Sequence, residues 1–314
     1  MLERKLGKSD IVITPLMLGG NVFGWTADEA TSFAILDAFV GQGGNSIDTA
    51  DAYSSWVPGH EGGESETVIG KWLKKSGKRS HVVIGTKVGL WGKRPGLKRQ
   101  NIIDGCDDSL RRLGVDTIDL YWLHRDDDET APEEYLGALD ELVRAGKVRA
   151  IGASNFKVPR FAVALETSAT LRKAAFVAQQ PEYNLLSREI EADLVPFCLR
   201  ENVSILPYFG LASGFLTGKY RTPADFPKSP RGAAPRMDKF LQGNGGVVLA
   251  ALDAVAARHE ATCAQVALAW IMAKPAMAAP IASATSVAQV NELMGALELK
   301  LTAMDLAQLD QASV

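Results

Sequence analysis

Four side chains of complementary chemistry follow consecutive apolar runs of the sequence. Asp48 and Tyr53 follow one run, Lys87 ends the next, and His124 ends the one after that. A tyrosine phenol has a pKa of about 10, and a neighbouring ammonium group lowers it by favouring the phenolate. We expect Lys87 to act on Tyr53 in this way, Asp48 to hold the lysine, and His124 to donate a hydrogen bond to a substrate oxygen. Together they would protonate a developing alkoxide.

Three of these residues also have an ordinary structural explanation. Asp48 is able to cap a helix, Lys87 to form a surface ion pair, and His124 to make a routine hydrogen bond at a strand end. Their recurrence at the ends of successive runs favours a shared site.

The apolar runs are rich in β-branched residues and alternate with longer segments of helical periodicity. Strands are predicted at 16–18, 46–48, 82–86, 120–124, 150–154, 176–180, 204–207 and 279–281. Helices are predicted at 28–42, 64–75, 99–113, 132–145, 158–172 and 189–201, with further helical segments near 239–258 and 262–274. Right-handed crossovers between parallel strands favour a (β/α)8 TIM barrel of the α/β class, with an open doubly wound sheet as the alternative. In a barrel the carboxyl ends of the strands share one mouth, where the four side chains would meet.

The length of 314 residues leaves one or two domains open, and the barrel interpretation predicts a single domain over 1–314. Its loops at the C-terminal mouth are extended, and a long insertion precedes the eighth strand. Basic residues outnumber acidic ones between Lys219 and Lys239. This excess indicates either a solvated loop or a flap over an anionic ligand, and we place the flap at 210–245.

Composition argues against several classes of function. The formal net charge is -3 with 23% charged residues, so no basic footprint for nucleic acid is present. No run approaches the roughly 20 apolar residues of a membrane span, and the charged N-terminus resembles no secretory signal. The sequence therefore predicts a cytoplasmic protein. Its cysteines number 3 and lack the spacing of metal ligands, so no metal site is predicted.

Several segments resemble, in order, the motifs of the aldo-keto reductase family: 46–53, 84–87, 119–124, 152–156 and 214–220. The resemblance runs from around Gly19 to the C-terminus. It implies a bacterial-type, NADPH-dependent carbonyl or aldehyde reductase with the (β/α)8 fold, which transfers a hydride between a nicotinamide cofactor and a small-molecule carbonyl or alcohol substrate without a metal. Asp48, Tyr53, Lys87 and His124 take the places of the catalytic tetrad.

The same resemblance implies where the cofactor would bind. Polar side chains after the fifth and sixth strands would hold the nicotinamide amide, and an aromatic residue after the seventh would stack on its ring. A glycine-containing loop would cross the pyrophosphate, and residues after the eighth strand would lie near the adenosine. In that order, the positions are Ser154, Asn155 and Gln180; Tyr208; Leu211, Gly214, Leu216, Thr217 and Lys219; and Ser283, Thr285, Gln289 and Glu292.

The adenosine end departs from the frequent family pattern, because no lysine or arginine directly follows the eighth strand. Arg231, in the insertion, stands where some branches place an arginine that is able to grip the 2′-phosphate. We therefore predict NADP(H), with NAD(H) as the alternative. Trp25, Trp56 and Trp91 lie in mouth loops and predict a flat, apolar substrate pocket for a bulky or aromatic carbonyl.

Two other functions compete with this interpretation. Some proteins that resemble the family are auxiliary subunits of potassium channels, so a cofactor-binding, redox-sensing regulatory subunit is the main alternative. A metal-dependent barrel hydrolase that uses Asp48, His124 and the acidic run 126–129 is disfavoured, because Lys87 would oppose a cation there.

Overall fold

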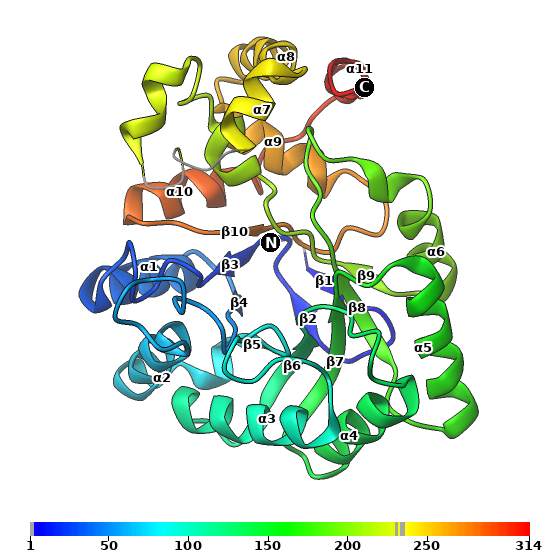
Figure 1. Ribbon diagram of the computed structural model, residues 1–314. Coiled ribbons are helices and arrows are strands. Elements are labelled where there is room, and N and C mark those ends of the chain that lie inside the picture. The colour runs from blue at the N-terminus through cyan, green and yellow to red at the C-terminus, as the bar shows by residue number, and fades with distance from the viewer. Residues whose placement is uncertain (1–2, 230–231, 233–235) are drawn as a thin grey trace.

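The computed structural model describes residues 3–229, 232 and 236–314, and Figure 1 shows strands in the middle of the molecule with helices around them. In this part of the chain, eight parallel strands form one sheet in the order β10-β3-β4-β5-β6-β7-β8-β9. The strands are β3 (Met17–Gly19), β4 (Ser46–Asp48), β5 (Val83–Val88), β6 (Ile118–Leu123), β7 (Val148–Ser154), β8 (Phe176–Gln180), β9 (Ser204–Ile205) and β10 (Ile281–Ala282).

The two outer strands of this sheet also meet. The Ile281 N–H of β10 donates to the Pro207 carbonyl, just after β9, at 2.8 Å, and the Ala278 N–H donates to the Ile205 carbonyl at 2.8 Å. These bonds join the ends of the sheet. The fold is therefore the predicted (β/α)8 barrel, and the alternative of an open sheet is wrong.

The helices lie outside the barrel (Figure 1). They are α1 (Glu29–Gly41), α2 (Glu64–Ser76), α3 (Arg99–Leu113), α4 (Pro132–Arg144), α5 (Val158–Leu171), α6 (Leu194–Glu201), α7 (Arg236–Gln242), α8 (Gly245–His259), α9 (Cys263–Met272), α10 (Val287–Gly295) and α11 (Ala303–Ala312). The first five agree with the predicted helices to within one residue at each end. The predicted helix at 189–201 is instead a 3-10 turn, η2 (Glu189–Glu191), followed by α6. Helices α10 and α11 were not predicted.

Local chemistry sets several of these helix ends. Asp28 caps α1 by accepting a hydrogen bond from the Thr31 N–H at 2.8 Å, and Pro132 occupies the first turn of α4, where its missing N–H costs nothing. Gly77 and Gly114 end α2 and α3 in the left-handed conformation, at φ 68° and 64°, which glycine adopts without steric cost. Such signals act over a few residues and are readable from the sequence.

An N-terminal hairpin, which the sequence analysis did not predict, packs on the amino-terminal end of the barrel. It pairs β1 (Arg4–Lys5) with β2 (Val12–Ile13), and its Leu6 and Ile11 are buried against interior residues such as Leu120. A cavity of about 290 Å³ lies between the hairpin and the starts of the strands.

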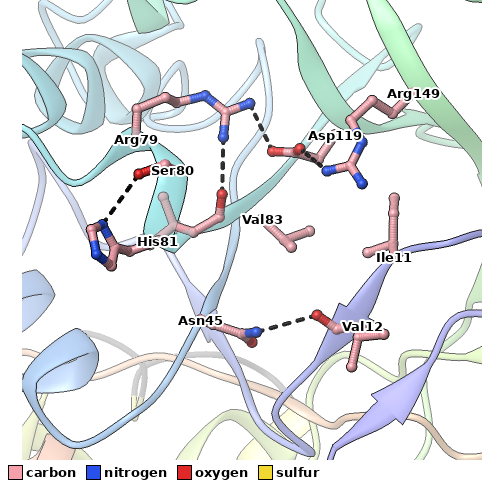
Figure 2. Close-up of a pocket in the computed structure, with 10 residues that line it drawn as sticks. Ile11, Val12, Asn45, Arg79, Ser80, His81, Val83, Asp119 and Arg149 are labelled. Carbon is pink, nitrogen blue, oxygen red and sulfur yellow. Dashed lines mark hydrogen bonds and ion pairs between the residues drawn. The ribbon is translucent and has the colours of Figure 1, made fainter.

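Figure 2 shows Arg79 and Arg149 on either side of Asp119 in this cavity. Arg79, in the 3-10 turn η1 (Arg79–His81), and Arg149 lie 2.9 Å and 2.7 Å from the two carboxylate oxygens. The Ile84 N–H also donates to Asp119, at 2.9 Å. These partners compensate the buried carboxylate, so the network ties β5, β6 and β7 together at the end of the barrel opposite the mouth.

Trp122 is fully buried and belongs to the cluster of apolar side chains that fills the barrel interior. A Cβ atom at Gly152 would lie 2.2 Å from Trp122 Cε3, and one at Gly85 would lie 2.9 Å from its Nε1. Glycine is required at both positions because the indole occupies the space that their side chains would need. The interior is thus packed rather than open, as is usual for this architecture, so a substrate site is expected at the strand ends and not inside the barrel.

In the described residues no single helix is long and apolar enough to cross a membrane. The pair α7 and α8, which is bent by 78°, reaches the length and apolar composition of a span only when the two helices are taken together.

Candidate active site

The barrel brings the four tetrad positions together at its mouth. Asp48 is the last residue of β4, Lys87 is the penultimate residue of β5, and His124 directly follows β6. Asp48 pairs in register with Gly85, and Lys87 pairs with Trp122. Tyr53 lies in the loop after β4. Three adjacent strands therefore deliver the side chains from one edge, as the sequence analysis expected.

Lys87 is the centre of the hydrogen-bond network. Its Nζ donates to Asp48 Oδ2 at 2.6 Å, to the Thr49 carbonyl at 2.8 Å and to Tyr53 Oη at 2.7 Å. The phenol oxygen also lies 3.0 Å from Asp48 Oδ2. An ammonium group has three protons, so these contacts use all of them. Burial lowers the pKa of Lys87, and the Asp48 carboxylate opposes this shift by attracting the charged form.

His124 faces the same phenol. Its ring centroid lies 6.1 Å from that of Tyr53, in an edge-to-face arrangement. Burial holds the pKa of His124 well below its ordinary value, and the nearby Lys87 and Arg125 cations lower it further. The imidazole is therefore neutral at neutral pH. Its Nδ1 is buried and has no hydrogen-bond partner in the described part of the chain.

A cluster of amides and hydroxyls adjoins the tetrad. Gln180, at the end of β8, donates from Nε2 to Asp48 Oδ1 at 3.1 Å, and the Ser154 hydroxyl donates to the Gln180 carbonyl at 2.8 Å. Asn155 donates to the His124 carbonyl at 3.1 Å and accepts from the Tyr208 hydroxyl at 2.7 Å. Four positions predicted from the family resemblance thus form one connected network with the tetrad.

The backbone conformation of Asn155 and the protonation of Tyr208 both support this cluster of amides and hydroxyls. Asn155 adopts the left-handed conformation at φ 60°, which asparagine tolerates better than most residues. Burial raises the pKa of Tyr208 to about 12, with a further contribution from the Glu182 carboxylate. Tyr208 is therefore a protonated phenol that donates to Asn155 at all physiological pH values.

The insertion after β9 contains the predicted phosphate loop. It begins with η3 (Ala212–Thr217), where Ser213 and Gly214 are left-handed at φ 58° and 95°. A Cβ atom on Gly214 would lie 3.2 Å from the Lys219 Nζ, so the ammonium rests directly against this glycine. Successive N–H groups of such turns, with a nearby cation, suit an anion.

Other positions of the insertion differ in their exposure. Leu216 is fully buried in the core. The Thr217 hydroxyl donates to the Gly214 carbonyl at 2.8 Å, while Leu211 is half-buried. Arg231 lies outside the described residues. Farther along, Arg236 pairs with Glu182 at 3.3 Å.

The predicted adenosine positions lie around the start of α10. The Ser283 hydroxyl donates to Asn21 Oδ1. Gln289 turns back to accept from the Thr285 N–H at 2.8 Å and from its hydroxyl at 3.2 Å. Glu292 is half-buried on the next turn of the helix.

The three predicted tryptophans occupy two different places. Trp25 and Trp56 pack edge to face with ring centroids 5.7 Å apart, and Trp56 lies 6.1 Å from the Tyr53 ring. Trp91 instead donates from its indole N–H to the Glu61 carbonyl at 2.9 Å, with the Arg112 guanidinium 5.9 Å from its ring. The structure thus places two of the three beside the tetrad.

The acidic run 126–129 is engaged in local contacts. Asp126 forms a bidentate interaction with Arg160 at 2.9 and 3.0 Å, and Asp127 accepts from the Leu97 N–H at 2.8 Å. In the described ranges no group of three or more His, Cys, Asp or Glu side chains is arranged to hold a metal ion.

Behind the tetrad lie two buried acids that the sequence analysis did not single out. Asp51 and Glu66 are 1% and 0% exposed, and Arg112 donates to Glu66 Oε2 at 2.6 Å. The only signal in the sequence was their proximity to the tetrad motif, since Asp51 stands three residues after Asp48. Whether such an acid is buried depends on helices that follow much later in the chain.

Together these features define a class of protein, a (β/α)8 barrel whose mouth gathers proton donors and acceptors beside a loop suited to phosphate. The model of the Aldo/keto reductase family matches residues 15–314, and the chain belongs to this family of oxidoreductases. The resemblance drawn from the sequence motifs is confirmed. The family uses nicotinamide cofactors.

The chain is similar to curated relatives along most of its length. "Aldo-keto reductase yakc [NADP(+)]" of Schizosaccharomyces pombe is 34% identical, covering 93% of this chain and 84% of the relative. The "Putative aryl-alcohol dehydrogenase AAD16" of Saccharomyces cerevisiae is 31% identical, covering 98% and 95%. "Aldo-keto reductase YhdN" of Bacillus subtilis is 34% identical, covering 82% and 76%.

Proposed function

We propose that this protein is an NADP(H)-dependent carbonyl reductase that interconverts aldehydes or ketones and the corresponding alcohols. The observation that carries the proposal is the triangle of Tyr53 Oη, Lys87 Nζ and Asp48 Oδ2, whose sides measure 2.7, 2.6 and 3.0 Å. A phenol held against an ammonium group in this way is an acid and base of adjustable strength. The neutral His124 lies beside it.

The residues around the triangle fit a nicotinamide dinucleotide. The hydroxyl and amides of Ser154, Asn155 and Gln180 suit a neutral carboxamide, and the ring of Tyr208 suits stacking on the nicotinamide. The Lys219 ammonium against Gly214 suits a pyrophosphate. When bound, the nicotinamide supplies a hydride to the carbonyl carbon in reduction and takes one from the alcohol carbon in oxidation.

The side chains handle the proton that accompanies this hydride. In reduction, Tyr53 donates its phenolic proton to the carbonyl oxygen as the C–O bond becomes single. Lys87 stabilises the phenolate that remains, and Asp48 keeps Lys87 in place. His124 donates a hydrogen bond to the same oxygen and so favours the negative charge that develops there. Oxidation runs the same path in reverse, with the phenolate accepting the alcohol proton.

Three features support the finer assignments. The S. pombe relative carries NADP(+) in its name, and Arg231 stands in the sequence where some family branches place an arginine for the 2′-phosphate, so we favour NADP(H) over NAD(H). We further propose that 210–245 lies over the cofactor within a single domain. The Trp25–Trp56 pair lies beside Tyr53 with its rings edge to face, and this aromatic surface favours a bulky or aromatic carbonyl substrate.

Titration with NADPH and NADH by fluorescence quenching, followed by a panel of aromatic and aliphatic carbonyls, tests the proposal. Tyr53→Phe is expected to lower kcat by about 10²–10⁴ because it removes the acid, while the Kd for NADPH stays the same. Tyr135→Phe is the matched control, since the buried Tyr135 hydroxyl has no partner in the described residues. Near-normal turnover by Tyr53→Phe, or binding of neither cofactor, contradicts the proposal.

A further inference from the structure

Asp51 is a buried acid for which the reaction just proposed has no role. It lies in the loop between Asp48 and Tyr53, and its backbone N–H donates to the Lys87 carbonyl at 3.2 Å. Its side chain is 1% exposed. Neither carboxyl oxygen has a hydrogen-bond partner of ordinary geometry in the described part of the chain, although the Ala52 N–H lies near enough to favour the ionised form.

The polar groups around this carboxyl hydrogen-bond to other acceptors. Arg112, from α3, donates to Glu66 on α2 at 2.6 Å, and the Thr86 hydroxyl of β5 donates to the same carboxylate at 2.5 Å. The Tyr121 hydroxyl of β6 donates to the Ile102 carbonyl at 3.2 Å. Lys87 already uses its three protons on the tetrad. A carboxylate that is buried without a hydrogen bond of ordinary geometry is costly, whereas a neutral carboxylic acid is much less so.

The balance of charge points the same way. The ionisable groups here are the buried acids Asp48, Asp51 and Glu66, the buried cation Lys87 and the partly buried cation Arg112, which is 19% exposed. With all of them ionised, the acids exceed the cations by one, and a proton on Asp51 restores neutrality. Burial raises the pKa of Asp51 to about 8, and the Glu66 carboxylate raises it too, while Arg112 and Lys87 pull in the opposite direction.

We infer that Asp51 is a positioning residue that acts through Lys87: it is a neutral carboxylic acid at neutral pH, and its ionisation in alkaline solution weakens the pull of the ammonium on the Tyr53 phenol. The inference rests on the proposed function. A negative charge behind Lys87 offsets part of its positive field, so the phenol keeps its proton to higher pH. Asp51 thereby preserves the acid needed for carbonyl reduction as the solution becomes alkaline.

The state of Asp51 is measurable in the wild-type protein without reference to turnover. Infrared difference spectroscopy of the full chain should show the C=O band of a buried carboxylic acid at pH 7 that disappears with a midpoint of about 8. Asp51→Asn should remove this band. Asp128→Asn is the matched control, because the Asp128 side chain is 92% exposed, and it should leave the band intact. Absence of a titrating acid band in the wild type overturns the inference.

The kinetic arm compares the pH dependence of kcat for carbonyl reduction. At pH 6–7, Asp51→Asn should match the wild type within about twofold, because asparagine is the neutral isostere of the protonated acid. Above pH 8 its activity should fall earlier, with the alkaline limb displaced to lower pH by on the order of half a unit. Superimposable profiles for the two proteins overturn the inference. Should Tyr53→Phe remain active, the proposed function fails, while the infrared band still reports on Asp51.

Glu66→Gln provides a second variant should Asp51→Asn fold poorly. Removing the neighbouring carboxylate charge makes ionisation of Asp51 easier, so the infrared midpoint should move to lower pH. An unchanged or higher midpoint contradicts the electrostatic coupling on which the inference depends.

Discussion

The buried ion pair between Lys87 and Asp48 predicts a strong energetic coupling. Its Nζ and Oδ2 atoms are 2.6 Å apart, and the two side chains are 0% and 1% exposed. At an effective dielectric constant of about 20, Coulomb's law gives an attraction of about 6 kcal/mol at close contact. Desolvation offsets part of it, and removing one partner of a buried pair generally costs about 3–5 kcal/mol.

A double-mutant cycle isolates this coupling. Lys87→Met leaves the Asp48 carboxylate buried beside Gln180 without its close counter-charge. Asp48→Asn leaves the Lys87 ammonium buried without its own close counter-charge. The double variant removes both charges, so its loss in the free energy of unfolding should be smaller than the sum of the single losses by about 3–5 kcal/mol. Urea unfolding of the four proteins at pH 7, with comparison of their m-values, measures the difference.

A surface pair of the same length provides the control. Lys78 and Asp37 are also 2.6 Å apart, but their side chains are 34% and 54% exposed. Their coupling should stay below about 1 kcal/mol, because water screens the charges and already solvates them. Additive losses for the buried pair, or equal coupling in the two pairs, would refute the reasoning that burial rather than distance sets the energy.

Three further predictions test the packing, the pH dependence and the phosphate loop. Gly152→Ala should destabilise the fold by about 1–3 kcal/mol, because its Cβ would lie 2.2 Å from Trp122 Cε3. Gly137→Ala, whose Cβ would meet nothing within 4 Å, should instead stabilise α4. Thermal unfolding distinguishes the two variants. Burial tends to raise the pKa of Asp305, but hydrogen bonds from His259 and other donors hold it well below its usual value. The ionised Asp305 therefore stabilises the fold at neutral pH, and this stabilisation is lost as the pH falls through the lowered pKa. Asp305→Asn should lower the free energy of unfolding by on the order of 2 kcal/mol at pH 7 and by progressively less towards pH 2. A loss that does not change with pH in urea unfolding contradicts this. Lys219→Met should weaken NADPH binding about tenfold at low salt and less at high salt. An unchanged Kd would show that Lys219 does not contact the phosphates.

The success of the sequence predictions follows the range of the interactions involved. Helices such as α3, whose predicted bounds of 99–113 are the observed ones, depend on periodicity and on a glycine directly after the last turn. The hairpin of β1 and β2 escaped prediction because each strand has two residues. It is stabilised by packing against the barrel interior, to which strands far along the chain contribute.

The features of the candidate active site also separate into those that the sequence predicted and those that it did not. Asp48, Lys87 and His124 were predicted to meet because the strand ends of a barrel share one mouth. The 2.6 Å between Asp48 and Lys87 and the 6.1 Å between the ring centroids of His124 and Tyr53 agree with that expectation. Their catalytic roles remain a prediction that the variants above examine. The bond from Gln180 to Asp48 and the separate position of Trp91 were not predictable, because each depends on the relative placement of distant loops and strands.

The sequence by itself determined the alternation of strands and helices, the family, and which side chains stand at the strand ends, because these depend on local pattern and chain order. The tertiary structure decided the state of each ionisable group. Asp48 and Asp51 are the same residue type three positions apart, yet one pairs with Lys87 at 2.6 Å and the other has no hydrogen-bond partner of ordinary geometry in the described residues. The charge of a carboxyl group depends on its desolvation and on neighbours supplied by other elements, and only the folded chain brings those together.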